Sequence, residues 1–326
     1  MHPAFSVIFL TVLMGIGQGI YLAMLTAEIY IYFDLLPELP DNVFYVIGSV
    51  LAALFLAGGL AASFAHLGRP ERAWRAAAQW RTSWLSREVL LVPAVVGVVL
   101  IYGLLYFFDW NPVLIDRVDA PPVRLSLIIA SLGTLLSFGL FVCTAMIYAC
   151  VKFLQEWHSP LTVINYITLG GASGFVFTAA YASFVAPELT SFYGGWAIVI
   201  TVVALITRGA SLIRNARLRP KSSPQTAIGV HHRKIVQKTQ GSMGGSFNTR
   251  EFFHHRSAMF LKSLRWIFLA SVFVLPIVLV GTGIATGLHE PFIVAFAIQF
   301  LGLLVERWYF FAEANHPQNI YYQSIA

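Results

Sequence analysis

The sequence predicts an all-α integral membrane protein with eight transmembrane helices. Three observations support this fold class: an apolar composition, eight apolar stretches of bilayer length, and connecting segments whose charge alternates. Of the 326 residues, 58% are hydrophobic and only 11% are charged, whereas soluble domains carry roughly a quarter charged residues. A chain this apolar cannot cover itself with a polar surface, so lipid must be its solvent over most of its outside.

Eight apolar stretches are long enough to cross the hydrocarbon core, which takes roughly 20 residues of helix. They must be helices, because in lipid every backbone polar group has to be satisfied within its own segment. We expect them to form a single transmembrane domain over residues 1–326. The stretches are 5–33, 42–65, 84–108, 125–151, 161–186, 192–213, 259–283 and 292–311.

The connecting segments alternate in charge along the chain. All but two of the 21 Lys and Arg residues belong to the second, fourth and sixth segments or to the C-terminal end, counting the helix ends beside each segment. The exceptions, Arg117 and Arg124, share the third segment with three Asp residues. Because Lys and Arg favour the cytoplasmic side, we expect the even-numbered segments and both termini to face the cytoplasm.

The sixth segment, residues 214–259, is long and basic, with Glu251 as its one acid. Two interpretations stay open: a solvated cytoplasmic loop attracted to anionic lipid, or a docking arm for a soluble partner, which we favour. The pairs His231–His232 and His254–His255 lack a third ligand type at a known metal-site spacing, so we expect no metal there.

The residues between the second and third spans carry the strongest chemical signal. This stretch reads His66-Leu-Gly-Arg-Pro-Glu-Arg-Ala-Trp-Arg-Ala and runs on to Trp84-Leu-Ser-Arg-Glu88. Pro70 stands where a helix can begin, since it has no N–H to satisfy. Arginines alternate with aromatic and Ala residues over 71–80, so we expect a short amphipathic helix along the membrane interface. Its tryptophans would anchor it at headgroup depth.

His66 and Glu88 are expected at the cytoplasmic rim of two adjacent antiparallel spans. Quinone reduction or oxidation moves two protons with two electrons, so a rim site needs a group that hydrogen-bonds a carbonyl and changes protonation near neutral pH. Histidine does this, and a carboxylate can relay the proton. The alternative is that His66 caps its span and Glu88 pairs with Arg69 or Arg87.

The pattern His-Leu-Gly-x-Pro-x-Arg-Ala, followed at this distance by Leu-Ser-x-Glu, resembles the membrane-anchor subunits of dimethyl-sulfoxide-reductase-type molybdoenzymes. Those anchors have eight spans, so the resemblance covers the whole chain in length and span count. The opening Met-His-Pro-Ala-Phe-Ser and the closing Glu-Arg-Trp-Tyr-Phe-Phe-Ala-Glu-Ala-Asn-His-Pro are most similar to the membrane subunits of cytoplasmic sulfite dehydrogenases.

The resemblance implies a three-part complex in the bacterial cytoplasmic membrane. A molybdopterin catalytic subunit would do the chemistry, an iron–sulfur subunit with [4Fe–4S] clusters would carry the electrons, and the anchor would exchange them with ubiquinone or menaquinone. The resemblance ties the histidine and the glutamate of the motif, here His66 and Glu88, to quinol binding. With them we group, as candidates for the quinone pocket, Arg69, Arg72, Trp74, Trp84 and Glu306.

We favour sulfite oxidation with quinone reduction, because a quinone rim on the cytoplasmic side needs the nearest cluster of the partner on that side. Two alternatives stay open: the anchor of a dimethyl sulfoxide or oxo-anion reductase that oxidises menaquinol, and a transporter or channel without a redox role. The chain has no CxxC, so we expect no iron–sulfur cluster on it. No predicted span has an interior histidine, so we expect no haem, and no partner nucleic acid is indicated.

Other residues of the spans are weaker candidates. Glu28, in the outer part of the first span, is a candidate for a proton route, or it is simply hydrated at the outer rim. Glu306 and Glu313 would join the quinone rim or the docking surface, or form an ion-paired helix end whose side chains reach the interface. The spacing of Gly15 with Gly19, and of Gly170 with Gly174, predicts close helix contacts.

Overall fold

The computed structural model describes residues 4–36, 41–65, 67–116, 121–219, 223–232, 234–236 and 257–314. Within these residues, eight helical segments are long and apolar enough to cross a membrane. Their positions confirm the eight stretches expected from the sequence. They are α1 (Phe5–Tyr32), α2 (Val43–Phe64), α3 (Trp84–Phe107), α4 (Leu125–Ala149), α5 (Pro160–Val185), α6 (Thr190–Ala216) preceded by η2 (Pro187–Leu189), a composite of α8 (Ala258–Leu269), η4 (Ala270–Val274) and α9 (Leu275–Thr286), and α10 (Glu290–Glu313).

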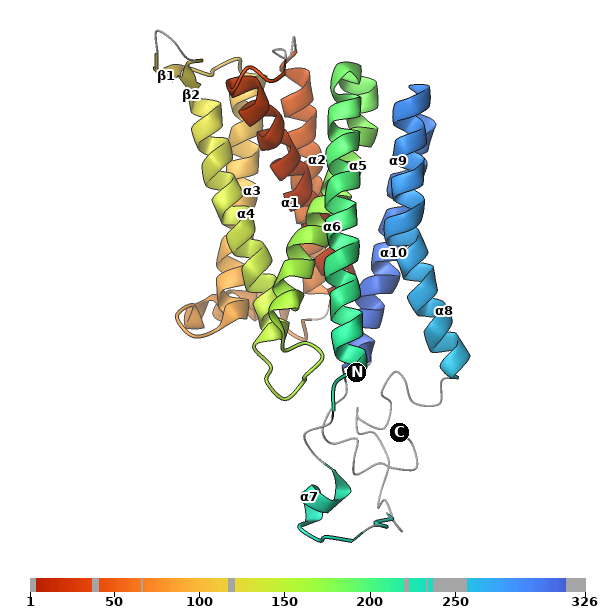
Figure 1. Cartoon of the computed structure of the whole chain (residues 1–326). Helices are drawn as coiled ribbons and strands as arrows, with labels where there is room; N and C mark the ends of the chain where they lie inside the picture. The colour runs from red at the N-terminus through yellow and green to blue at the C-terminus, as the bar shows by residue number, and fades with distance from the viewer. Residues whose placement is uncertain are drawn as a thin grey trace.

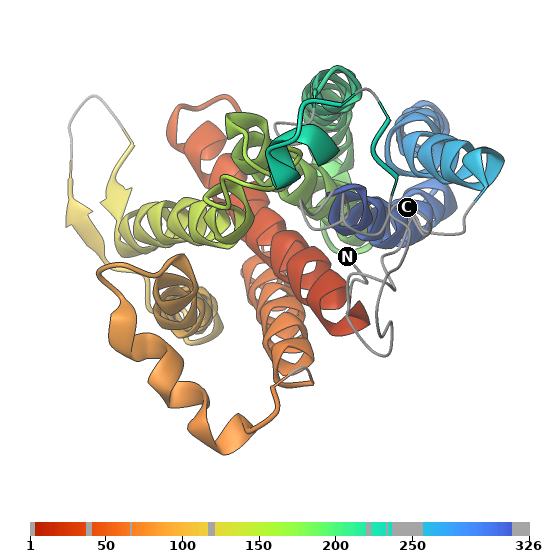
Figure 2. The same cartoon turned by 90° about the horizontal axis from the view of Figure 1, so that it is seen from below.

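Helix α1 occupies the centre of the bundle (Figure 1), where it packs against α2, α4, α5 and α10. Seen along the bundle axis in Figure 2, α1 crosses between α2 and α3 on one side and α5 and α10 on the other. Its central position explains why so much of it is buried, including Gln18 and Glu28, which are polar. Outer helices such as α3 and α4 instead expose long apolar side chains, as lipid-facing helices do.

The contact between α1 and α5 depends on glycine. A Cβ atom added to Gly19 would lie 2.3 Å from the carbonyl oxygen of Gly170, and one added to Gly174 would lie 2.2 Å from the carbonyl carbon of Gly19. Gly15 likewise faces the Cα atom of Gly170. The two backbones therefore approach more closely than any side chain permits, which confirms the close contact expected from the glycine spacing.

The seventh span bends where α8 passes through the π-helix η4 into α9. Pro276 has no N–H to donate to the carbonyl of Val272, four residues earlier. The side-chain amide of Gln299, fully buried on α10, donates to that carbonyl at 3.1 Å. A neighbouring helix thus satisfies the backbone group that proline leaves open, as broken membrane helices require.

The two ends of the bundle differ in what they carry (Figures 1 and 2). At one end lie the 3₁₀ helix η1 (Pro70–Gln79), the short helix α7 (Pro224–Ile228), the beginning of α1 and the end of α10. We call this the η1 end. The other, the hairpin end, carries strands β1 (Val113–Ile115) and β2 (Val123–Arg124), which pair antiparallel. The described basic segments therefore share one end, as the charge pattern predicts.

Three local features differ from what the sequence predicts. The segment expected as an amphipathic helix is a 3₁₀ helix without any buried residue, and it loops outside the bundle between α2 and α3 (Figure 2). The hairpin and α7 were not expected, because both lie in connecting segments that we interpreted by charge alone. In α7, Ser223 and Thr226 form a reciprocal capping box, a local signal that holds even so short a helix.

Replacing Gly174 with Ala tests the α1–α5 contact. The added methyl group would meet backbone atoms, which cannot rotate away, so the two helices must separate at a cost typical of overpacking, about 1–3 kcal/mol. We expect a lower midpoint of thermal unfolding in detergent. Gly195→Ala on α6 is the control, because nothing lies within 4 Å of its added Cβ. Equal midpoints for the two variants would contradict the contact.

Candidate functional site

Glu88 lies inside the bundle at the η1 end, on the second turn of α3. Helix α3 begins at Trp84 because the side chain of Ser83 accepts a hydrogen bond from the N–H of Ser86 at 3.3 Å and so caps the helix. Only 6% of Glu88 is exposed, and its Oε1 accepts a hydrogen bond of 2.5 Å from the hydroxyl of Thr144 on α4. The predicted rim carboxylate is thus buried between two helices and held by a single hydroxyl.

Arg87, the neighbour of Glu88, fastens η1 to α3. Its guanidinium donates to the carbonyls of Trp80, at 2.9 Å, and Arg81, at 2.7 Å. It also lies 4.3 Å from the ring centroid of Trp84. Arg87 is therefore occupied by backbone and ring contacts, and the alternative in which it pairs with Glu88 is wrong. No ion pair joins Glu88 to a cation in the part of the chain that the structure describes.

The described residues of η1 that were predicted for the quinone pocket are exposed, unlike Glu88. His66 lies outside the described residues. Arg69, Arg72 and Trp74 are exposed on η1 and at its start, and Trp84 is half-buried. Arg72 makes a long ion pair of 4.0 Å with the equally exposed Glu71. These residues are close to Glu88 in the sequence. In the structure, however, the side chains on η1 are exposed, whereas Glu88 is buried in the bundle.

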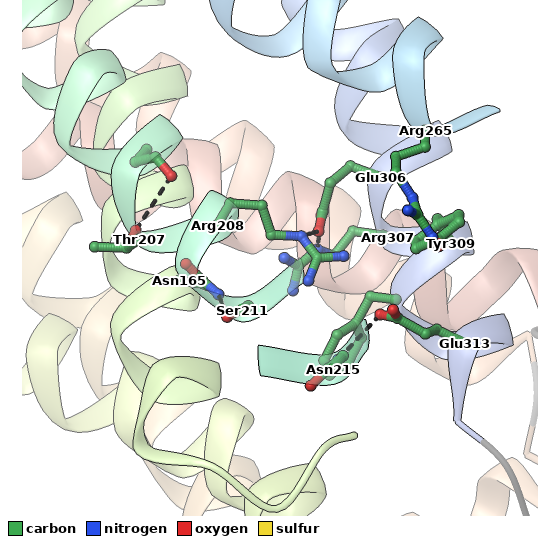
Figure 3. Close-up of polar contacts among 12 residues, drawn as sticks. Asn165, Thr207, Arg208, Ser211, Asn215, Arg265, Glu306, Arg307, Tyr309 and Glu313 are labelled. Atoms are coloured by element: carbon green, nitrogen blue, oxygen red, sulfur yellow. Dashed lines mark hydrogen bonds and ion pairs between the residues drawn. The ribbon is translucent and has the colours of Figure 1, made fainter. Parts of the chain in front are cut away.

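Glu306 belongs to a buried ion-pair cluster that joins α6 to α10 (Figure 3). Its Oε1 lies 2.7 Å from Nε of Arg208, and its Oε2 lies 2.6 Å from Nε of Arg307. The exposed fractions of Glu306, Arg208 and Arg307 are 0%, 2% and 4%. Two arginines thus share one carboxylate in an environment that screens their attraction little.

Aromatic rings and a second set of polar contacts surround this cluster. The guanidinium of Arg307 lies 4.4 Å from the ring centroid of Tyr166, and that of Arg208 lies 5.6 Å from the ring of Phe268. Around them, contacts between helices involve polar side chains that point toward one another in Figure 3. These are Asn165 with Ser211 at 2.7 Å, Asn215 with Glu313 at 3.1 Å, and Arg265 with Tyr309 at 2.7 Å.

A small cavity lies beside partners of both carboxylates. It measures about 20 Å³ and is lined, among others, by Gln18, Thr144, Tyr166 and Arg307. This is room for about one water molecule. Thr144 contacts Glu88 and Arg307 contacts Glu306, so the cavity is lined by one partner of each carboxylate. Chemically, Glu88 can accept or release a proton, whereas Glu306 is held in ion pairs with two arginines.

Comparison with known proteins identifies the family. Residues 1–311 match the family model described as "DMSO reductase anchor subunit (DmsC)". The chain belongs to this family. It is also 57% identical, over all 326 residues and the full length of both chains, to a protein of Allochromatium vinosum that is named as a subunit of sulfite dehydrogenase. The family and this relative agree with the resemblance drawn from the His66 and Glu88 motif.

Arg208 is the residue of this anchor subunit that sequence reasoning missed. It was counted with the basic sixth segment, whereas the structure buries it about two turns inside α6. The available signal was a lone arginine within an apolar stretch, which requires an acidic partner on another span. The ion pairing expected as an alternative for Glu306 is present. The expected position at the interface is wrong, because Arg208 draws the carboxylate into the bundle.

Glu306→Gln tests the buried cluster of the anchor. It leaves two buried arginines without a counter-charge, and removing one partner of a buried ion pair costs about 3–5 kcal/mol. We expect a marked fall in the midpoint of thermal unfolding. Glu71→Gln is the matched control, because its ion pair is long and exposed and contributes at most about 1 kcal/mol. If the cluster did not stabilise the fold, Glu306→Gln and Glu71→Gln would have similar midpoints of thermal unfolding.

Proposed function

We propose that this anchor subunit is the quinone-reactive membrane subunit of a sulfite-oxidising molybdoenzyme complex. A molybdopterin subunit would oxidise sulfite, and an iron–sulfur subunit would bring the electrons to the anchor and to quinone in the membrane. The observation that carries this proposal is the identity of 57%, over the full length of both chains, to the sulfite dehydrogenase subunit of Allochromatium vinosum. At such identity over full length, the surfaces that contact partners are also expected to be similar.

We place the quinone site at the η1 end, around Glu88 and His66. Reduction of a quinone takes up two protons, so the site needs a carboxylate or imidazole that exchanges protons. Glu88 is suited to this role, because one hydroxyl orients it and no described cation neutralises it. The exposed Trp74 on η1 and Trp80 directly after it suit the lipid headgroup region, where a quinone ring enters from the bilayer.

We place the η1 end on the cytoplasmic side, because the basic segments gather there. Residues 214–259 would then form a cytoplasmic docking arm for the iron–sulfur subunit. The start of this arm is held firmly, since Arg214 donates to the carbonyls of Gln155, at 3.0 Å, and His158, at 3.1 Å, in the loop between α4 and α5. A fixed base of this kind lets a basic arm present its charge to an acidic partner surface.

Isolation of the complex in mild detergent tests the assembly. With this chain tagged, we expect a large molybdenum protein and an iron–sulfur protein to co-purify, and sulfite to reduce decylubiquinone. The family name also supports a reductase, so the same preparation is offered a reduced menaquinone analogue with dimethyl sulfoxide. Turnover with dimethyl sulfoxide but not with sulfite would contradict sulfite as the substrate and would favour a dimethyl sulfoxide reductase. Purification of a stable, lone chain would refute the proposal and favour a transporter or channel.

Substitution of Glu88 tests the quinone site. In the intact complex, Glu88→Gln and His66→Ala should each lower quinone reduction by about 100-fold or more, the usual contribution of a general acid or base. Electron transfer from sulfite to the iron–sulfur clusters, followed by their absorbance, should stay unchanged. Glu188→Gln, an exposed residue at the hairpin end, serves as the control. Normal quinone reduction by Glu88→Gln would remove this residue from the site.

A further inference from the structure

The hairpin end contains a cavity of about 300 Å³ that the proposed quinone chemistry does not use. It opens between α1, α2, α3, α4 and the connecting segments beside them. Glu28 lines this cavity although only 8% of the residue is exposed. Nearer the ends of the helices, Asp34, Asp109 and Arg124 line it too. A buried carboxylate therefore faces a space that holds several water molecules.

Glu28 is incompletely satisfied by its neighbours. Its Oε1 accepts a hydrogen bond from the hydroxyl of Tyr106 on α3. The hydroxyls of Tyr102 and Ser126 lie nearby, but Oε2 has no hydrogen-bond partner among the described residues. No described cation forms an ion pair with it either. Leaving a buried polar atom unpaired is costly. A further hydrogen-bond or proton partner for the Glu28 carboxyl group would therefore have to come from the cavity.

The polar groups around the cavity show which partner fits. Asn42 donates to Asp109 at 2.9 Å and Asn111 donates to Ser126 at 3.0 Å, so much of the polar lining is already paired. The described lining contains more acidic residues than its one basic residue, Arg124, and this charge balance favours a positively charged species in the cavity. A metal ion needs several ligands, and no group of three metal-binding side chains occurs in the described part of the chain. A proton carried by water requires only one carboxylate.

An aromatic layer packs on the inner side of the cavity, with Tyr45 and Tyr106 in its lining. Tyr45 stacks on Tyr106 with ring centroids 4.2 Å apart, and Tyr102 packs edge-on against Tyr21 at 5.5 Å. Tyr21, Tyr45 and Tyr102 are all buried. Other titratable or charged groups also face Glu28 or the cavity. On the helices these are Tyr21 and Tyr32 of α1, Tyr45 of α2, Tyr102 and Tyr106 of α3, and Tyr193 of α6. In the connecting segments they are Asp34 after α1, Asp109 after α3 and Arg124 before α4.

We propose that this cavity is a water-filled vestibule in which Glu28 exchanges protons with the aqueous phase at the hairpin end. A hydronium ion in the cavity gives its proton to the Glu28 carboxylate and leaves as water, and the reverse step returns the proton. Tyr106 positions the carboxyl group through its hydrogen bond to Oε1. The aromatic layer makes the exchange one-sided, so the vestibule is not a channel through the membrane.

Infrared difference spectroscopy on the purified complex tests the exchange. Between acidic and alkaline buffer, the wild-type complex should show a change in a carboxylic acid C=O band that Glu28→Gln lacks and Glu188→Gln retains. On transfer to D₂O the same band should shift within the mixing time. A band that is absent, or one that resists exchange for hours, would overturn the vestibule.

Cysteine labelling tests access and its direction. In a background where Cys143 and Cys150 are replaced by Ser, a membrane-impermeant thiol reagent should label Glu28→Cys and Glu71→Cys from opposite faces of membrane vesicles. Ala130→Cys is the unlabelled control, because Ala130 is fully buried on α4 and is not among the residues that line the cavity. Labelling of Glu28→Cys from the η1 side, from both sides, or not at all would refute the proposal.

This inference goes beyond the proposed function and fails separately from it. The vestibule lies at the end opposite η1, so Glu28→Gln should leave quinone reduction by the complex within about twofold of the wild type. A complex without any quinone activity would leave the infrared and labelling results unaffected. Conversely, a Glu28 that shows no proton exchange would not change the interpretation of the Glu88→Gln experiment.

Discussion

The contact between α1 and α5 organises the bundle. Four glycines let the two helices approach backbone to backbone, at a distance where no Cβ atom fits at Gly19 or Gly174. This contact places α1 in the centre, against α2, α4 and α10 as well. It also brings Gln18 of α1 and Tyr166 of α5 to the same small cavity as Thr144 and Arg307. The polar interior at the η1 end therefore depends on a purely steric property of glycine.

Three buried carboxylates among the described residues of this bundle have two kinds of environment. Glu306 forms ion pairs with Arg208 and Arg307, which join α6 to α10. Glu88 and Glu28 instead accept hydrogen bonds from hydroxyl groups, and neither forms an ion pair with a described cation. A carboxylate without a counter-charge is suited to exchanging protons, whereas one between two arginines is not. The surroundings, more than the residue type, separate structural from functional acids here.

The two uncompensated carboxylates lie at opposite ends of the membrane domain. Glu88 is close to η1 and to the basic segments, on the side where we expect the partner subunits. Glu28 lies at the hairpin end, behind a cavity and in front of an aromatic layer. A single anchor could thus present one face to electron-carrying partners and the other only to water and lipid. This division matches the charge asymmetry of the connecting segments.

The sequence by itself determined the eight spans, their common end for the basic segments and the glycine contact, because hydrophobic length, charge and residue size act locally along the chain. It also carried the family, through the motif around His66 and Glu88 and the two ends of the chain. Only the tertiary structure decided which polar residues meet. Arg208 and Glu306 are almost 100 positions apart, and pairing between spans leaves no periodic signal in either. The same holds for the cavity at Glu28, since its walls come from several helices and its shape depends on how closely those helices pack.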